Sequence, residues 1–269
     1  LTLQADTGIT ESDFTNYGLF EYQGLPYHVM DDGTAEICNV DNIQGGYVSG
    51  NSITMENVVI PAEVSHNGQS YRVTKIGDQT FQGCTSVKTV VIPEGVTEIG
   101  YQAFYNATNV QWPKMPSTLR EIKGNCFYMC RNLGKIVLPE GLTTLWNGCF
   151  TRTFDMGGHI SEIVFPGTLT TITNDWNEFG QLCSDRKAGT VDRIVFNANP
   201  DWESLKFSFG TFSRGVNCKE IVINRDLVDY DAKWDKVNLG NVTGLETLRF
   251  GATVTQVPDL SGCLSLIHI

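Results

Sequence analysis

The sequence predicts a mainly β solenoid, in which short repeats coil around one core and their strands stack into a parallel sheet. The first observation is an aromatic column at a constant spacing of 23 residues: Phe81, Phe104, Phe127 and Phe150. The second is an aliphatic column in step with it: Ile76, Ile99, Ile122 and Leu145. The third is a proline column: Pro93, Pro116 and Pro139. Columns that share one period mark an internal repeat, and a period of about 20–50 residues is typical of solenoids and related arrays.

Each unit contains a strand, a turn and a second apolar stretch. In residues 89–92 the core side chains alternate, as a half-buried strand requires. Pro93 has no amide N–H and ends strand pairing, and the Glu-Gly pair that follows turns the chain. Val96 and Ile99 then return to the core, and Phe104 fills the convex side. Because one unit cannot bury these side chains alone, we expect the units to stack with strands about 4.8 Å apart.

Two units, VKTVVIPEGVTEIGYQAF (87–104) and LGKIVLPEGLTTLWNGCF (133–150), resemble the BspA-type leucine-rich repeat, whose pattern is LxxIxIPxxVxxIGxxAFxxC. Residues 58–84 are similar to the usual entry unit of that family. The resemblance is specific from about Val58 to Phe165 and recurs at 218–223 and 245–269. It implies a leucine-rich repeat solenoid with a parallel sheet and short turns or short 3-10 helices on the convex side.

The units lengthen after about residue 150. Their strand cores lie 27, 31, 27 and 27 residues apart, at Ile136, Ile163, Ile194, Ile221 and Leu248. We therefore expect extra loops at residues 173–190, 197–217 and 224–244, with room for short helices. The parallel strands are predicted at residues 89–92, 135–138, 162–165, 193–196, 220–223 and 247–250.

Residues 1–57 do not repeat and are predicted to form an N-terminal β cap, followed by repeats over residues 58–269. Strand-like runs at 18–30 and 34–40 flank an Asp-Asp-Gly turn, and an Asp-Gly pair between such runs predicts a hairpin. At the other end, residues 263–269 match residues 84–90. Because the chain stops within this predicted strand, we expect either further repeats or another element covering that end.

Charge and hydropathy narrow the classes of partner. The chain has 30 Asp and Glu against 19 Lys and Arg, a formal net charge of −11, which argues against nucleic acid and anionic membranes as partners. No apolar run of about 20 residues is present, so no transmembrane helix is predicted. The chain begins at Leu1 without Met, and we expect a signal peptide to have been removed.

Eight cysteines invite disulfides, but their spacing favours buried free thiols. Cys126 and Cys149 are one repeat apart, where stacked Cβ atoms lie about 4.8 Å apart, farther than the roughly 3.8 Å of a disulfide. No CxxC pair supports a metal site. The acidic cluster Asp226, Asp229, Asp231 and Asp235 does not fit EF-hand spacing, which favours a solvated loop. No metal and no cofactor are predicted.

Catalytic motifs are missing from the sequence. It contains no HExxH, GxSxG, Walker loop or GxGxxG, and its four histidines are scattered. We therefore predict a protein that is not an enzyme, although a dyad assembled from distant positions stays open.

Two sets of residues are candidate ligand-binding positions. The first precedes successive strand cores and should form a ladder of alternating charge on the open face of the sheet: Lys135, Glu162, Arg193 and Glu220. A valine column two positions on should form an exposed ridge beside it: Val137, Val164, Val195 and Val222. Stabilisation of the sheet and its register is the competing interpretation of the ladder. The second set lies in the predicted loops, where covering the core is the competing role: Trp176, Trp202, Tyr230 and Trp234.

The resemblance implies a secreted or cell-surface module of a host-associated bacterium that serves in adhesion. Its partner would be a host or bacterial surface protein, with a glycan as a further possibility. The alternative hypothesis is a carbohydrate-binding or nutrient-capture accessory protein, in which exposed tryptophans stack on sugar rings. The periodicity itself predicts only the scaffold, because a fold does not determine function.

Overall fold

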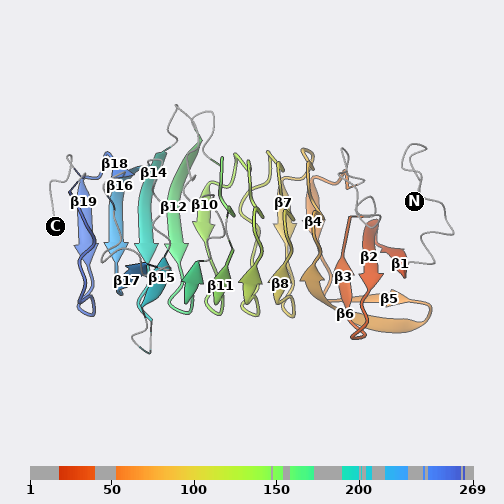
Figure 1. Cartoon of the computed structure of the whole chain (residues 1–269). Coiled ribbons are helices and arrows are strands. Elements are labelled where there is room, and N and C mark those ends of the chain that lie inside the picture. Colours follow the sequence, from red (N-terminus) through yellow and green to blue (C-terminus); the bar gives the residue numbers. More distant parts are fainter. Residues whose placement is uncertain are drawn as a thin grey trace.

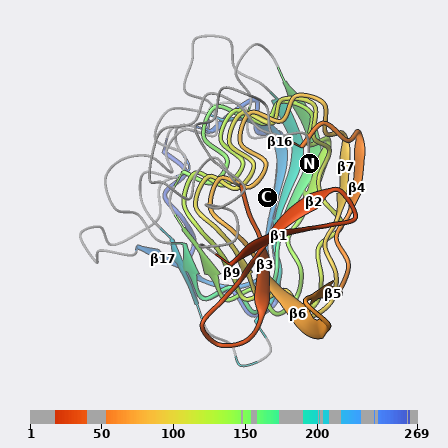
Figure 2. The ribbon, with the colours of Figure 1, turned by 90° about the vertical axis from the view of Figure 1, so that its right-hand side faces the viewer.

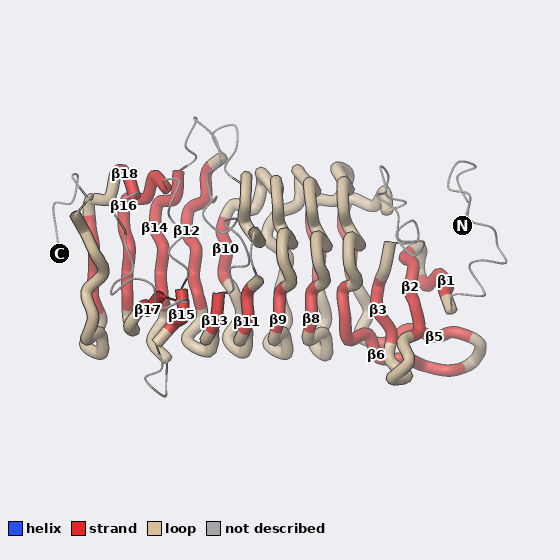
Figure 3. Tube along the Cα trace, viewed as in Figure 1, coloured by secondary structure: helices blue, strands red, loops and turns tan. Residues whose placement is uncertain are grey.

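The computed structural model describes residues 18–39, 53–146, 148–153, 158–172, 190–199, 201, 204–207, 216–229, 239, 242–261 and 263. These residues form a β solenoid, in which successive coils lie side by side in chain order (Figure 1). Strands and turns make up the whole of this described part, without a helix (Figure 3). The convex side is therefore built from turns, and the short helices allowed by the sequence are not found in these ranges.

The first sheet contains the predicted strand cores. Its parallel strands are β10 (Lys135–Val137), β12 (His159–Phe165), β14 (Thr190–Phe196) and β16 (Val216–Ile223), and β16 also pairs with β18 (Val242–Thr243) and β19 (Thr247–Phe250). Two earlier strands, β4 (Asn57–Val59) and β7 (Thr89–Val91), pair with each other in parallel as a separate sheet. The predicted parallel register is confirmed, but the strand at 89–92 is not continuous with the later strands.

Pro113 explains the break between β7 and β10. It occupies the strand-core position one repeat after Val90, and its missing N–H removes a ladder hydrogen bond. On the β7 side of this coil, a single bridge remains, between Val91 and Lys114. On the other side, the Trp112 indole Nε1 donates to the carbonyl oxygen of Val137 at 3.1 Å, a side-chain bond at the edge of β10.

A second sheet runs along the solenoid and has the strand order β1-β2-β3-β6-β8-β9-β11-β13-β15-β17, with β5 on β6. Its short repeat strands are β8 (Glu98–Ile99), β9 (Glu121–Ile122), β11 (Thr144–Leu145), β13 (Thr171–Ile172), β15 (Leu205–Phe207) and β17 (Leu227–Asp229). The aliphatic column lies in register across it, from Ile76 through Ile99 and Ile122 to Leu145. Strands β15 and β17 lie in segments predicted as loops, so the second sheet continues through the lengthened units.

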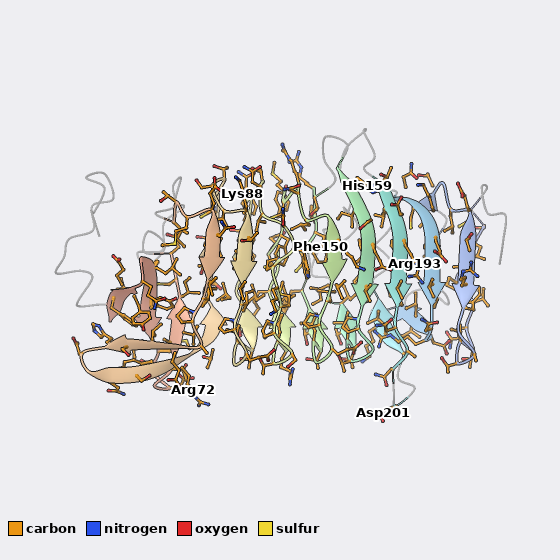
Figure 4. The ribbon with its side chains drawn as sticks, turned by 180° about the vertical axis from the view of Figure 1, so that it is seen from behind. Arg72, Lys88, Phe150, His159, Arg193 and Asp201 are labelled. Carbon is orange, nitrogen blue, oxygen red and sulfur yellow. The ribbon has the colours of Figure 1, made fainter. Side chains whose placement is uncertain are left out.

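The core lies between the two sheets and contains the aromatic column. The four rings at the 23-residue spacing are stacked, with centroids 4.9, 5.0 and 5.9 Å apart along the series. All four phenylalanines are fully buried (Phe150 is labelled in Figure 4). The half-buried Trp112 packs against the same core, with its ring 5.0 Å from that of Phe127.

Turns with left-handed backbone recur once per coil at two positions. One series is Gln79, Gln102 and Asn125, and the other is Asn106, Met129 and Arg152, with φ between 52° and 58°. Non-glycine residues seldom adopt this conformation, so the stacked neighbours must stabilise it. Gln79 Nε2, for example, donates to Gln102 Oε1 at 2.9 Å in the next coil.

The N-terminal region joins the second sheet. The predicted hairpin around residues 31–33 is present between β2 (Leu25–Val29) and β3 (Ala35–Ile37). The run 18–30 is two strands, because a turn at Gln23-Gly24 separates β1 (Leu19–Tyr22) from β2. β3 pairs in parallel with β6 (Gln69–Ile76), which continues the sheet to β8. β6 also forms a projecting antiparallel hairpin with β5 (Glu63–His66) (Figure 2). The division of the chain at residue 57 stays a prediction.

Several predicted features fall outside the described residues. They include most of the loops 173–190, 197–217 and 224–244, and residues 264–269 of the predicted C-terminal strand.

Candidate functional site

The charge ladder on the first sheet has the predicted register. Lys135, Glu162, Arg193 and Glu220 oppose one another on consecutive strands. Lys135 Nζ lies 2.7 Å from Glu162 Oε2, and Arg193 Nη1 lies 2.8 Å from Glu162 Oε1. Arg193 Nε lies 3.2 Å from Glu220 Oε2 (Arg193 is labelled in Figure 4). Each inner member therefore has partners on both sides.

A fifth member of the ladder was not predicted. Arg249 Nε donates to Glu220 Oε1 at 2.8 Å. Arg249 opposes Val222, one column away, while the uncharged Thr247 occupies the ladder position itself. Sequence reasoning missed Arg249 because its spacing assigns it to the valine column. The completed ladder has three cations and two carboxylates, and both of its ends are cationic.

The ion pairs affect the protonation of the ladder. Hydrogen bonding from Lys135, followed by hydrogen bonding from Arg193 and the charge of both cations, holds the pKa of Glu162 below its usual range despite partial burial. Glu162 therefore stays ionised well into the acid range, and the ladder keeps its alternating charge there.

The valine column was predicted to be exposed throughout, but only its first two members are open to solvent. Val137 is 41% exposed and Val164 is half-buried, as an open ridge requires. Val195 and Val222, at 7% and 8% exposure, are buried, so the prediction of exposure is wrong there. Opposite Val222, the Arg249 side chain reaches back to Glu220 and covers this end of the face.

A smaller polar cluster lies on the same face near the start of β12. His159 Nε2 lies 3.2 Å from Asp192 Oδ2, and Lys219 Nζ lies 3.0 Å from Asp192 Oδ1. Thr190 Oγ1 is 2.9 Å from Nδ1 of His159. The Lys219 hydrogen bond is the main cause of the lowered pKa of Asp192. These contacts join three neighbouring strands, which is a stabilising arrangement on an exposed surface.

The predicted loop aromatics, Trp176, Trp202, Tyr230 and Trp234, lie outside the described residues, and their binding role stays a prediction. The two described tryptophans are engaged by the protein itself. Trp112 is half-buried and packs against the core. Lys123 Nζ lies 4.9 Å over the Trp146 ring, whose Nε1 donates to Glu121.

The cysteines are core residues, as predicted. Cys183 lies outside the described residues, and the other seven are free thiols. Six of these are buried and Cys263 is half-buried. Burial raises the pKa of Cys84, Cys149 and Cys218 to about 12, so these thiols stay protonated and unreactive.

The described residues contain no group of three or more His, Cys, Asp or Glu side chains able to hold a metal ion. Of the acidic cluster at 226–235, the Asp226 carboxylate accepts backbone hydrogen bonds from Thr255 and Gln256 at 2.7 and 2.9 Å. The side chains of Asp229, Asp231 and Asp235 are outside the described residues.

The repeat region matches a known family. Residues 50–179 match a model described as the BspA type leucine rich repeat region, in six copies. This stretch belongs to the BspA-type leucine-rich repeat family. Among curated proteins, none matches the chain.

Solved structures of leucine-rich repeat proteins are similar to this chain, and the first of them shares its fold. A leucine-rich repeat protein of T. pallidum is 19% identical, with 92% of this chain and 90% of that chain covered and a TM-score of 0.55. A leucine rich cell surface protein of Faecalibacterium prausnitzii A2-165 is also 19% identical, with 92% and 81% covered and a TM-score of 0.40. A Bacteroides capillosus leucine-rich repeat protein is 23% identical, with 59% and 99% covered and a TM-score of 0.42.

In the part of the chain that the structure describes, no helix has the length and apolar character needed to cross a membrane.

Proposed function

We propose that this chain is a protein-binding module of a bacterial secreted or cell-surface protein, and that it serves in adhesion. The observation that carries the proposal is the outer face of the first sheet. It bears charged and aliphatic side chains at fixed spacing, and no further layer of described residues covers it (Figures 2 and 4). Stacked repeats commonly use such an extended surface for binding.

The family membership supports the binding class, and the Faecalibacterium relative described as a cell surface protein supports the location. A non-enzymatic role is part of the proposal. In the described residues the ladder and the His159–Asp192–Lys219 cluster consist of mutually paired side chains on an open face, where solvent screens them.

The carbohydrate hypothesis requires exposed aromatic faces. Both described tryptophans have rings engaged by other side chains, Trp112 by Phe127 and Trp146 by Lys123. A glycan-binding role therefore depends on Trp176, Trp202 and Trp234, and protein binding is better supported by the residues described.

The test is a binding screen of the purified chain against a panel of host matrix proteins and bacterial surface proteins, alongside a glycan array. We expect binding to a protein of the panel. For that protein, Val137→Asp should weaken binding by about tenfold, because it places a charge on the outer face. Val257→Asp is the matched control, since Val257 is similarly exposed, at 48%, and lies outside the named strands.

Glycan binding in the absence of any protein ligand would refute the proposed function. Equal losses in the two aspartate variants would refute the first sheet as the binding face.

A further inference from the structure

The N-terminal half of the outer face differs chemically from the charge ladder. Four neighbouring positions form what we call the valine–lysine strip: Val59, Val91, Lys114 and Val137. Val59 pairs with Val91 on the adjacent strand, and Val91 forms a bridge with Lys114. The Trp112 indole contact to the Val137 carbonyl places Val137 on the next coil. The strip thus crosses four coils, roughly 14 Å at the spacing of parallel strands.

The strip exposes aliphatic surface where the other end of the same column does not. Val59 is 65% exposed, and Val91 is half-buried. Val195 and Val222, at the other end of the column, are buried beside the arginines of the ladder. Apolar surface available to a partner is therefore concentrated in the N-terminal half of the face.

The strip also contains a cation, Lys114, that has no counterion in the part of the chain that the structure describes. Lys88 beside it pairs with Glu56 at 3.0 Å, and Lys135 pairs with Glu162. Lys114 is exposed and has no ion pair among the described residues. The chain as a whole has a formal charge of −11. At physiological ionic strength charges farther than about 8 Å are largely screened, so a docked group responds to Lys114 more than to the remote acidic residues.

We propose that the valine–lysine strip binds an acidic segment of a partner protein, extended across the strands, with apolar side chains on the valines and a carboxylate on Lys114. This rests on the proposed function and specifies its partner. An extended chain of about four or five residues spans the strip, at about 3.3 Å per residue. Aliphatic contacts favour a peptide over a glycan, because sugar rings stack on aromatic faces and the Trp112 ring is packed against Phe127 and Phe150.

The probe is a fluorescein-labelled decapeptide of alternating Glu and Val, titrated with the full chain at physiological ionic strength, where the remote acidic residues are screened, and followed by fluorescence anisotropy. A Lys-Val decapeptide and heparin are tested in parallel. We expect the chain to bind the Glu-Val peptide and neither the Lys-Val peptide nor heparin. The affinity for the Glu-Val peptide should fall by about tenfold in Lys114→Glu and by about threefold in Lys114→Met, which keeps the aliphatic stem. Lys206→Glu, an exposed lysine of β15 on the second sheet, makes the same charge change and should alter binding less than twofold.

Four results would overturn the inference. They are no binding of the Glu-Val peptide, equally strong binding of the Lys-Val peptide, equally strong binding of heparin, and equal losses in Lys114→Glu and Lys206→Glu. Melting temperatures of all variants are measured. If Lys114→Glu fails to fold, the test rests on Lys114→Met, and unchanged binding in that variant would overturn the inference. A panel protein that binds through Val137 but ignores both Lys114 variants would sink this inference and leave the proposed function standing.

Discussion

Removing the charge of Glu162 tests whether the ladder stabilises the sheet. Glu162 accepts from Lys135 at 2.7 Å and from Arg193 at 2.8 Å, so Glu162→Gln removes two ion pairs with little change of shape. Exposed pairs across neighbouring strands contribute about 0.2–1 kcal/mol each. Lys135 and Arg193 are 57% and 42% exposed, and solvent screening therefore places the total near the middle of the combined range, at about 1 kcal/mol. For a chain of this size that is about 2–4 °C in melting temperature.

The pH dependence follows from the lowered pKa of Glu162. A carboxyl whose folded pKa lies below its unfolded value of about 4.3 contributes stability above that value. The contribution is lost as the pH falls through the folded pKa, where the carboxylate of the native ladder becomes protonated. The wild type should therefore be more stable than Glu162→Gln at neutral pH, and the two should converge in strong acid.

The assay is thermal and urea unfolding followed by circular dichroism, at pH 7 and pH 3 and at 50 mM and 1 M NaCl. Glu246→Gln is the matched control, because Glu246 is exposed and has no ion pair within 4.0 Å among the described residues. High salt should shrink the difference at pH 7. A difference that is the same at both pH values, or a variant that is more stable than the wild type at pH 7, would contradict the reasoning.

Other predictions concern the core, the turns and the loops. Phe127→Ala should cost about 3–5 kcal/mol in urea unfolding, since its ring is stacked on both sides; a loss under about 1 kcal/mol would argue against that packing. Met129→Asn should raise stability by about 0.5–1 kcal/mol, because asparagine tolerates the left-handed backbone at φ 58°; an unchanged melting temperature would show that no strain is relieved. Thiol titration should find few reactive cysteines in the native chain and most of the eight after unfolding without reductant; recovery of fewer than half would indicate disulfides. If the loops bind the partner, Trp176→Ala, Trp202→Ala and Trp234→Ala should weaken binding at constant melting temperature. Unchanged binding with a lower melting temperature in all three would rule that out.

Periodicity in the sequence was enough to predict the solenoid, its two apolar columns and the register of the ladder. The reason is geometric: when each coil adds a whole repeat, equivalent positions must lie side by side on neighbouring strands. Lys135 and Glu162 could therefore be paired from their spacing alone. The same logic placed Phe127 between two identical rings and made free thiols the better interpretation of Cys126 and Cys149.

The break in the first sheet, the exposure of side chains and the full set of ion pairs were decided by interactions between coils. Pro113 occupies a strand-core position in the repeat. Only the folded chain shows that strand pairing is interrupted there and that the Trp112 indole donates a hydrogen bond to the next coil. Arg249 belongs by spacing to the valine column, but its long side chain reaches diagonally to Glu220. Spacing determines which backbone positions are neighbours, whereas exposure and ion pairing depend on where flexible side chains reach, and that is resolved only when the coils are packed together.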